Sequence, residues 1–207
     1  MKKNNFNCLI NSFLFFLCFC KFIFAQENSA AIFAYHRFGE QTFPSTNIKL
    51  KQFKSHINEI KKNNYNVLPI NEIIDHIINK KPLPEKTIGL TIDDGFKSIY
   101  NNAWPLIKAA GLPVTIFITT GTIGSGSKNH MTWKEIKELS DSGVTIGHHT
   151  VNHYHLVNKS LDTLENEIEN ANNAFKKNLG YIPNIFSYHY GEYSLQIKEL
   201  IKKIPNE

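Results

Sequence analysis

Short apolar segments alternate with amphipathic segments along most of this chain, and that alternation limits the possible folds more than any other feature. An apolar run of four to eight residues is typical of a buried strand, whereas apolar residues spaced by three and four indicate one face of a helix. Strands that alternate with helices favour a parallel sheet with the helices outside it. Periodicity alone does not decide between an open, doubly wound sheet and a barrel. The strands are expected at 30–35, 65–68, 87–92, 113–119, 144–147 and 185–188.

The expected helices carry ordinary start and stop signals. Thr132 and Glu135 have the spacing of a capping box, and Ser160 has the place of an N-cap. Gly180 is placed to end the helix that Ser160 begins. The helices are expected near 50–60, 70–78, 103–110, 132–143, 160–180 and 195–204.

The first 25 residues have the pattern of a secretory signal peptide. Lys2 and Lys3 form a basic start, an apolar stretch follows, and Ala25 is a small residue at a suitable cleavage point. We therefore expect a mature domain at 26–207 that is secreted, periplasmic or in the cell envelope. The alternative is an uncleaved leader, which would be the chain's one contact with a membrane.

Composition excludes several classes of function. The net charge of +5 includes Lys2, Lys3 and Lys21 of the leader, and without them the chain has only 20 basic against 18 acidic residues. So balanced a domain does not indicate a nucleic acid partner. All three cysteines lie in the leader as well, so the mature domain has no disulfide, thiolate ligand or cysteine nucleophile. Histidines and carboxylates would have to hold any metal ion.

Two adjacent carboxylates end the expected strand 87–92. Asp93 and Asp94 are followed by Gly95, and functional groups of α/β folds gather where strands end. Two neighbouring anions repel each other, and a bound cation would remove that cost. The alternative is a solvated Asp-Gly turn, which is common in loops.

A cluster of histidines follows the expected strand 144–147. It contains His148, His149, His153 and His155 within eight residues. His149 and His153 are four apart, so in a helical turn both imidazoles would face the same side. Such a pair suits Zn²⁺ or a similar cation, and the cluster favours metal binding over a merely solvated loop.

An aromatic segment follows the expected strand 185–188. Residues 186–193 read Phe-Ser-Tyr-His-Tyr-Gly-Glu-Tyr. Aromatic rings beside a glycine suit a sugar-binding wall, although composition alone equally fits an aromatic edge of the core.

In this order the three motifs resemble the polysaccharide deacetylase family, also known as the NodB-homology domain or carbohydrate esterase family four. Tyr35-His36-Arg37 is similar to the family's opening segment, and the likeness covers roughly residues 30–195. The resemblance implies a deformed, incomplete (β/α) barrel. It also implies hydrolysis of N-acetyl, and sometimes O-acetyl, groups on an acetylated glycan.

The resemblance also implies roles for individual residues. A single divalent ion is expected, with Zn²⁺ as the first choice and Co²⁺, Ni²⁺ or Fe²⁺ as alternatives. Three protein ligands would leave room for water and the acetyl carbonyl. The implied metal ligands are Asp94, His149 and His153, and the implied general base is Asp93. The backbone N–H of Tyr190 is expected to donate to the oxyanion. Thr150 is expected to support the site or contact substrate, and His36 is expected to line the mouth of the active site.

The chain departs from the family pattern at several points. His189 stands where the family usually has proline, and His148 stands where a small polar residue is common. The family's last motif supplies a histidine that protonates the leaving amine, and no histidine follows His189 here. We therefore expect a chain cut short before the usual end, with apolar surface left open and with deacetylation weak or lost. His148 or His189 could replace the missing acid only if its ring reached the leaving nitrogen. The alternatives are a glycan-binding relative with weak or no catalysis and a hydrolase of other non-peptide C–N bonds.

Overall fold

The computed structural model describes residues 29–202, and every structural statement below concerns that part of the chain. The predicted leader lies outside it. None of the helices between residues 29 and 202 is both long and apolar enough to cross a membrane.

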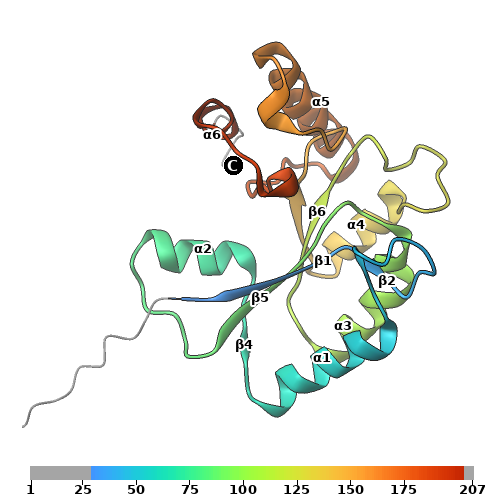
Figure 1. The fold of residues 1–207 in the computed structure, drawn as a ribbon, viewed down its shortest axis with the longest axis vertical. Coiled ribbons are helices and arrows are strands. Elements are labelled where there is room, and N and C mark those ends of the chain that lie inside the picture. Colours follow the sequence, from blue (N-terminus) through green and yellow to red (C-terminus); the bar gives the residue numbers. More distant parts are fainter. Residues whose placement is uncertain (1–28, 203–207) are drawn as a thin grey trace, which may run out of the picture.

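Strands and helices alternate as the sequence predicts, with the helices around the outside of the strands (Figure 1). The capping box at Thr132 is present, and Gly180 ends its helix in the left-handed conformation. The strands are β1 (Ala31–Tyr35), β2 (Arg37–Phe38), β3 (Asn47–Ile48), β4 (Asn66–Val67), β5 (Thr87–Ile92), β6 (Thr115–Ile118) and β7 (Thr145–His148). The helices are α1 (Leu50–Lys62), α2 (Ile70–Ile78), α3 (Trp104–Ala110), α4 (Trp133–Asp141), α5 (Leu161–Leu179) and α6 (Leu195–Ile201), with a π-helical turn at Ile99–Ala103 and short 3₁₀ turns at Leu156–Asn158 and His189–Gly191.

The main sheet is parallel throughout, which confirms the α/β class. Its order is β1-β5-β6-β7, with β4 beside the start of β5. All parallel strands end at the same edge, so the segments after β1, β5, β6 and β7 meet there.

The predicted strand 185–188 is wrong in extent. Only a single bridge forms, in which His148 N–H donates to Ile185 C=O and Ser187 N–H donates to His148 C=O. The pairing stops because the Ser187 carbonyl accepts a hydrogen bond from the His149 ring instead of a neighbouring strand. The end of the sheet is thereby tied to the histidine cluster.

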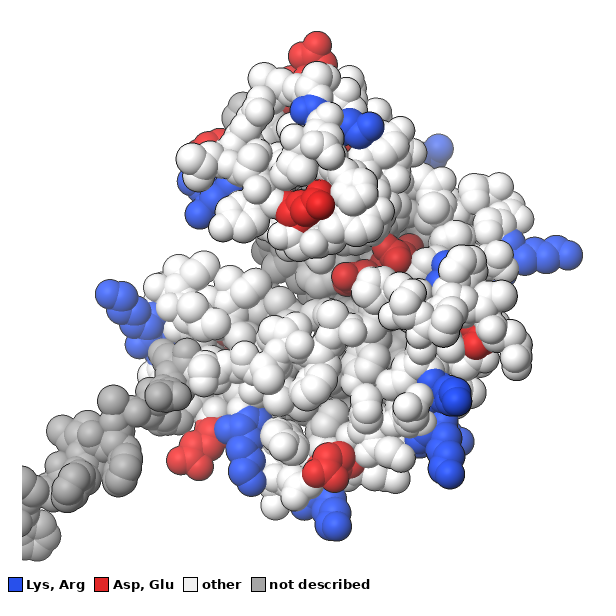
Figure 2. All heavy atoms as spheres, in the orientation of Figure 1, with Lys and Arg blue, Asp and Glu red and all other residues white. Residues whose placement is uncertain are grey.

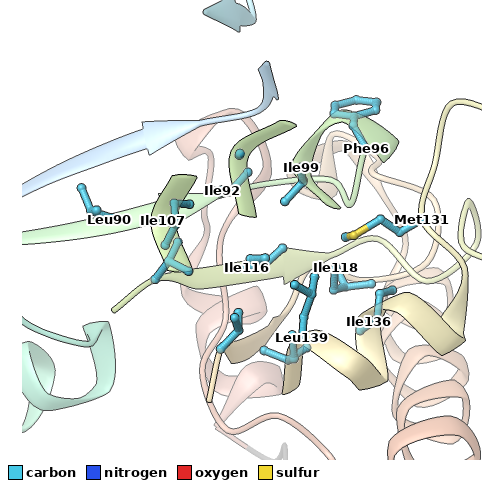
Figure 3. Packing of buried hydrophobic residues seen from close by; sticks show 14 of the residues in the cluster. Leu90, Ile92, Phe96, Ile99, Ile107, Ile116, Ile118, Met131, Ile136 and Leu139 are labelled. Atoms are coloured by element: carbon cyan, nitrogen blue, oxygen red, sulfur yellow. The ribbon is translucent and has the colours of Figure 1, made fainter. Parts of the chain in front are cut away.

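The hydrophobic core lies between the sheet and the helices of one face. All six residues of β5 are buried, which explains its continuous apolar sequence. Burial of an aliphatic side chain stabilises a fold by about 1.5–3 kcal/mol. Figure 3 shows β5 and β6 side chains packed against those of α3 and α4, among them Leu90, Ile92, Ile107, Ile116, Ile118, Ile136 and Leu139.

The sheet is open on the side of β1, which pairs with β5 alone among the described strands. Ile32 and Phe33 are 48% and 46% exposed there. A cavity of about 480 Å³ lies between β1, α2 and the segment 186–191, and it reaches Asp93. In Figure 2 the surface is hollowed between the part that carries α5 and α6 and the part that carries α2 and β1. Apolar side chains of β1 are therefore exposed at this edge of the sheet.

Candidate metal-binding and catalytic site

The carboxylate pair and the histidine cluster lie together where β5 and β7 end. Asp94 has a φ of 76° and Gly95 a φ of 85°, so the chain turns sharply after β5. A positive φ is uncommon for a residue with a side chain and is often found at functional sites. Through this turn Asp94 Oδ1 comes to lie 3.7 Å from His149 Nε2 and 3.3 Å from His153 Nε2.

The other ring nitrogen of each histidine has a partner of its own. His149 Nδ1 lies 2.8 Å from the Ser187 carbonyl, which can only accept, so Nδ1 carries the proton. His153 Nδ1 lies 3.2 Å from the hydroxyl of Tyr190. Burial, and next the nearby His189 and His153 rings, lower the pKa of His149 to about 2. A neutral His149 ring with its proton on Nδ1 presents a bare lone pair at Nε2.

These atoms fit a divalent cation. Asp94 Oδ1 is buried and has no hydrogen-bond partner, although it faces two ring nitrogens. A carboxylate oxygen and a nitrogen lone pair that point at each other repel, and a cation between them would turn that repulsion into coordination. Two imidazoles and one carboxylate are common ligands of catalytic zinc sites.

His189 is the third imidazole in this cluster, and one of its ring nitrogens lies within 4.8 Å of one ring nitrogen of His149 and one of His153. Its Nδ1 lies 2.8 Å from the Tyr154 carbonyl and its Nε2 lies 3.0 Å from the His149 carbonyl. Both nitrogens therefore face backbone oxygens, and a neutral ring donates its single N–H to one of them. For that reason we prefer Asp94 over His189 as the third candidate ligand.

Asp93 differs from Asp94 in its surroundings. Its backbone N–H donates to the Tyr35 carbonyl, while its Oδ1 is buried without a hydrogen bond. Burial, and next the charge of Asp94, raise the pKa of Asp93 to about 7. A carboxyl with such a pKa can take up and release a proton near neutral pH.

The loop between the two histidines is not the helical turn that the sequence predicted. Thr150 and His153 both have a φ of 54°, so the chain reverses twice in the left-handed region. The two imidazole rings nevertheless lie with centroids 5.0 Å apart. The two rings are therefore close, as predicted, but the backbone between them is not helical.

Three other predicted positions can be located. Thr150 is fully buried, with its hydroxyl 3.3 Å from His189 Nε2, a position that suits support of the loop better than contact with substrate. Tyr190 is 59% exposed, and its ring stacks on His155. His36, at the end of β1, lines a cavity of about 290 Å³.

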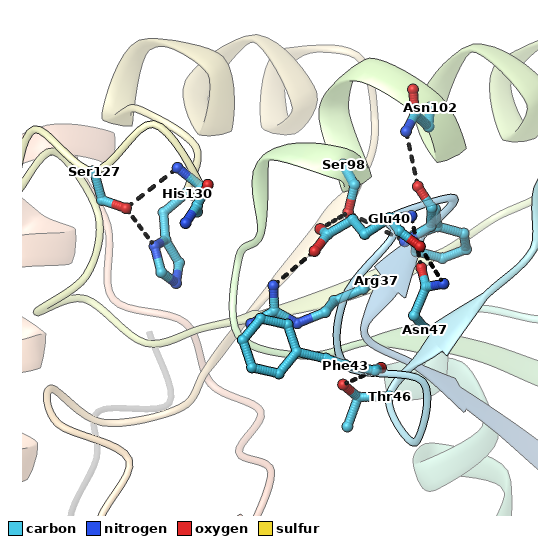
Figure 4. A network of polar contacts seen from close by, with 11 residues as sticks. Arg37, Glu40, Phe43, Thr46, Asn47, Ser98, Asn102, Ser127 and His130 are labelled. Carbon is cyan, nitrogen blue, oxygen red and sulfur yellow. Dashed lines mark hydrogen bonds and ion pairs between the residues drawn. The ribbon is translucent and has the colours of Figure 1, made fainter.

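The segment after β1 is fixed by the network in Figure 4. The Arg37 guanidinium lies 3.4 Å from the ring centroid of Phe96 and forms an ion pair with Glu40. Ser98 donates a hydrogen bond to the same Glu40. Because Phe96 follows Gly95, this network joins the turn that carries Asp94 to the end of β1.

Sequence reasoning missed two contributions to the site. One is the hydroxyl of Tyr190, since the resemblance pointed only to its backbone. The other is Glu167, whose carboxylate accepts hydrogen bonds from the loop after His149. The sequence does contain a sign of this role. Glu167 lies on the apolar face of α5 with Leu164 and Ala171, where a charged side chain needs a partner.

Comparison with known proteins points to one family. The model of the family described as polysaccharide deacetylase matches residues 80–207. The YxkH protein of Bacillus subtilis (strain 168) is 28% identical over 159 residues, which are 77% of this chain and 56% of that protein. The chain thus spans little more than half the length of this relative. A poly-beta-1,6-N-acetyl-D-glucosamine N-deacetylase of Staphylococcus aureus (strain MRSA252) is 25% identical over 86% of this chain and 70% of that enzyme.

Solved structures support the fold. The Streptococcus pyogenes deacetylase PplD in complex with acetate matches 84% of this chain and 80% of its own, with a TM-score of 0.76 and 24% identity. IcaB from Ammonifex degensii matches 86% of this chain and 81% of its own, with a TM-score of 0.76 and 23% identity. The architecture is therefore the (β/α) barrel type of these proteins, which confirms the deformed, incomplete barrel that the resemblance implied.

Proposed function

Because the chain belongs to the polysaccharide deacetylase family, we propose that it removes acetyl groups from a polysaccharide of the cell envelope by metal-dependent hydrolysis. The observation that carries the proposal is the unpartnered Asp94 Oδ1, which faces the Nε2 atoms of His149 and His153. A substrate of N-acetylglucosamine units agrees with the activity for which the Staphylococcus aureus relative is named.

Each residue has one task in the proposed mechanism. Asp94, His149 and His153 hold the metal ion, with Zn²⁺ as the first choice. When bound, such an ion polarises the acetyl carbonyl and lowers the pKa of water. Asp93 takes the proton of the attacking water, and the raised pKa of its carboxyl suits that exchange. The backbone N–H of Tyr190 donates to the oxyanion of the tetrahedral intermediate.

The two histidines that the sequence suggested as proton donors to the leaving amine, His148 and His189, are both buried. His148 is fully buried between the rings of Phe175 and Phe186, and its Nδ1 accepts from Thr150 N–H. His189 is buried too, with both nitrogens at backbone carbonyls. Neither of the two replacements considered from the sequence is therefore placed to reach a leaving nitrogen.

The test is acetate release from β-1,6-linked and β-1,4-linked N-acetylglucosamine oligomers, acetylated xylan and an activated aryl acetate, with Zn²⁺ present. We expect slow release from an N-acetylglucosamine oligomer and faster release from the aryl acetate, whose leaving group needs no proton. General acid catalysis typically increases a rate by about 10² to 10⁴, and the ratio of the aryl acetate rate to the oligomer rate should fall in that range. Acetate release from none of the glycans would refute the proposed function, and equal rates on oligomer and aryl ester would reveal a competent acid.

A further inference from the structure

The loop that joins His149 to His153 belongs to no helix or strand, so its backbone polar groups need hydrogen-bond partners from other segments. The carbonyl oxygens of Thr150 and Val151 accept from the N–H groups of Thr120 and Gly121, at 2.9 and 3.0 Å. A Cβ atom at Gly121 would lie 2.6 Å from the Val151 carbonyl oxygen, so only glycine allows this approach. The segment after β6 therefore fixes one side of the loop.

Glu167 fixes the other side. This residue of α5 is only 5% exposed, and its Oε2 accepts from the backbone N–H groups of Val151 and Asn152 at 3.1 and 2.9 Å. Its Oε1 accepts from the Asn152 side-chain amide at 2.6 Å. All three donors belong to the loop, and two of them are backbone groups midway between His149 and His153.

Burial of a carboxylate is costly unless charge or hydrogen bonds compensate it. No ion pair of Glu167 occurs among residues 29–202, so the loop donors are its compensation. A leucine at this place would serve the packing of α5 equally well, as Leu164 does one turn earlier. The packing of α5 does not require a carboxylate at this position, whereas the hydrogen bonds to the loop do.

We propose that Glu167 is a positioning residue for the metal site, which sets the separation of the His149 and His153 imidazoles by holding the peptide groups of Val151 and Asn152. The proposal rests on the proposed function for the metal, but the hold on the loop can be measured without one. Residues that orient metal ligands typically change metal affinity by about 10- to 100-fold when they are replaced.

The test variant is Glu167→Gln, which keeps the shape of the side chain but removes its charge and replaces one acceptor oxygen by an NH₂ donor that faces at least one of the loop donors. We expect Zn²⁺ affinity, measured by competition with a chelator, to fall by about 10- to 100-fold. Hydrogen exchange of the Val151 and Asn152 amides in the metal-free protein should become faster. Glu165→Gln and Glu169→Gln change exposed glutamates of the same helix and should leave both values unchanged.

A second variant keeps the test decisive if Glu167→Gln does not fold. Asn152→Ala removes an exposed side chain and only the Oε1 contact, and a smaller loss of Zn²⁺ affinity is expected. A folded Glu167→Gln protein with unchanged exchange of the two amides, or with unchanged Zn²⁺ affinity, would overturn the proposal. If the unaltered protein bound no Zn²⁺, the proposed function would fail by itself, and the amide exchange would still decide whether Glu167 holds the loop.

Discussion

An Asp93→Asn variant is expected to lose acetate release and to keep its metal. Asparagine has nearly the same shape as aspartate but cannot accept the proton of the attacking water. General base catalysis contributes about 10² to 10⁴ in rate, so kcat should fall by about that factor. Metal content by elemental analysis and acetate release should be measured on the same preparation.

The neighbouring Asp94→Asn variant is the matched control for Asp93→Asn. Its change is chemically identical and one residue away, but it alters the oxygen that faces His149 and His153. We expect it to bind Zn²⁺ more weakly and to regain part of its activity when excess Zn²⁺ is added. If Asp93→Asn emptied the site and Asp94→Asn did not, the two roles would have to be exchanged.

The double variant His149→Ala, His153→Ala is expected to lose bound metal almost completely. It removes both nitrogen ligands, and Asp94 alone is a poor site for Zn²⁺. The control is His56→Ala, His76→Ala, which removes two imidazoles from α1 and α2 and should keep its full metal content. Equal metal content in the two double variants would place the metal elsewhere in the chain.

The strands and helices that carry the site could be predicted because local signals define them. The apolar run of β5 ends at Asp93, and the capping residues Thr132 and Ser160 begin helices where expected. Proximity of the carboxylates to the histidines followed from a general property of parallel sheets, whose strands end at one edge. The barrel could be predicted only from the family resemblance, because hydrophobic periodicity carries no information on whether a sheet closes.

The details of the loop could not be predicted from the sequence. Spacing of four residues suggested a helical turn for His149 and His153, but hydrogen bonds to Glu167, Thr120 and Gly121 stabilise a left-handed path instead. Those partners are 15 or more residues away in the chain, so no local pattern reveals them. The same holds for Ser187, whose carbonyl orients the His149 ring and ends the pairing of its segment with β7.

Titration of the metal-free protein with Zn²⁺, with acetate release from a β-1,6-linked N-acetylglucosamine oligomer as the readout, tests the central claim most directly. The claim is that one ion, held by Asp94, His149 and His153, is required for deacetylation. We predict no release without metal and a linear rise that levels off at one equivalent of Zn²⁺ per chain. Release at the full rate by the metal-free protein, or a rate that Zn²⁺ leaves unchanged, would contradict the claim.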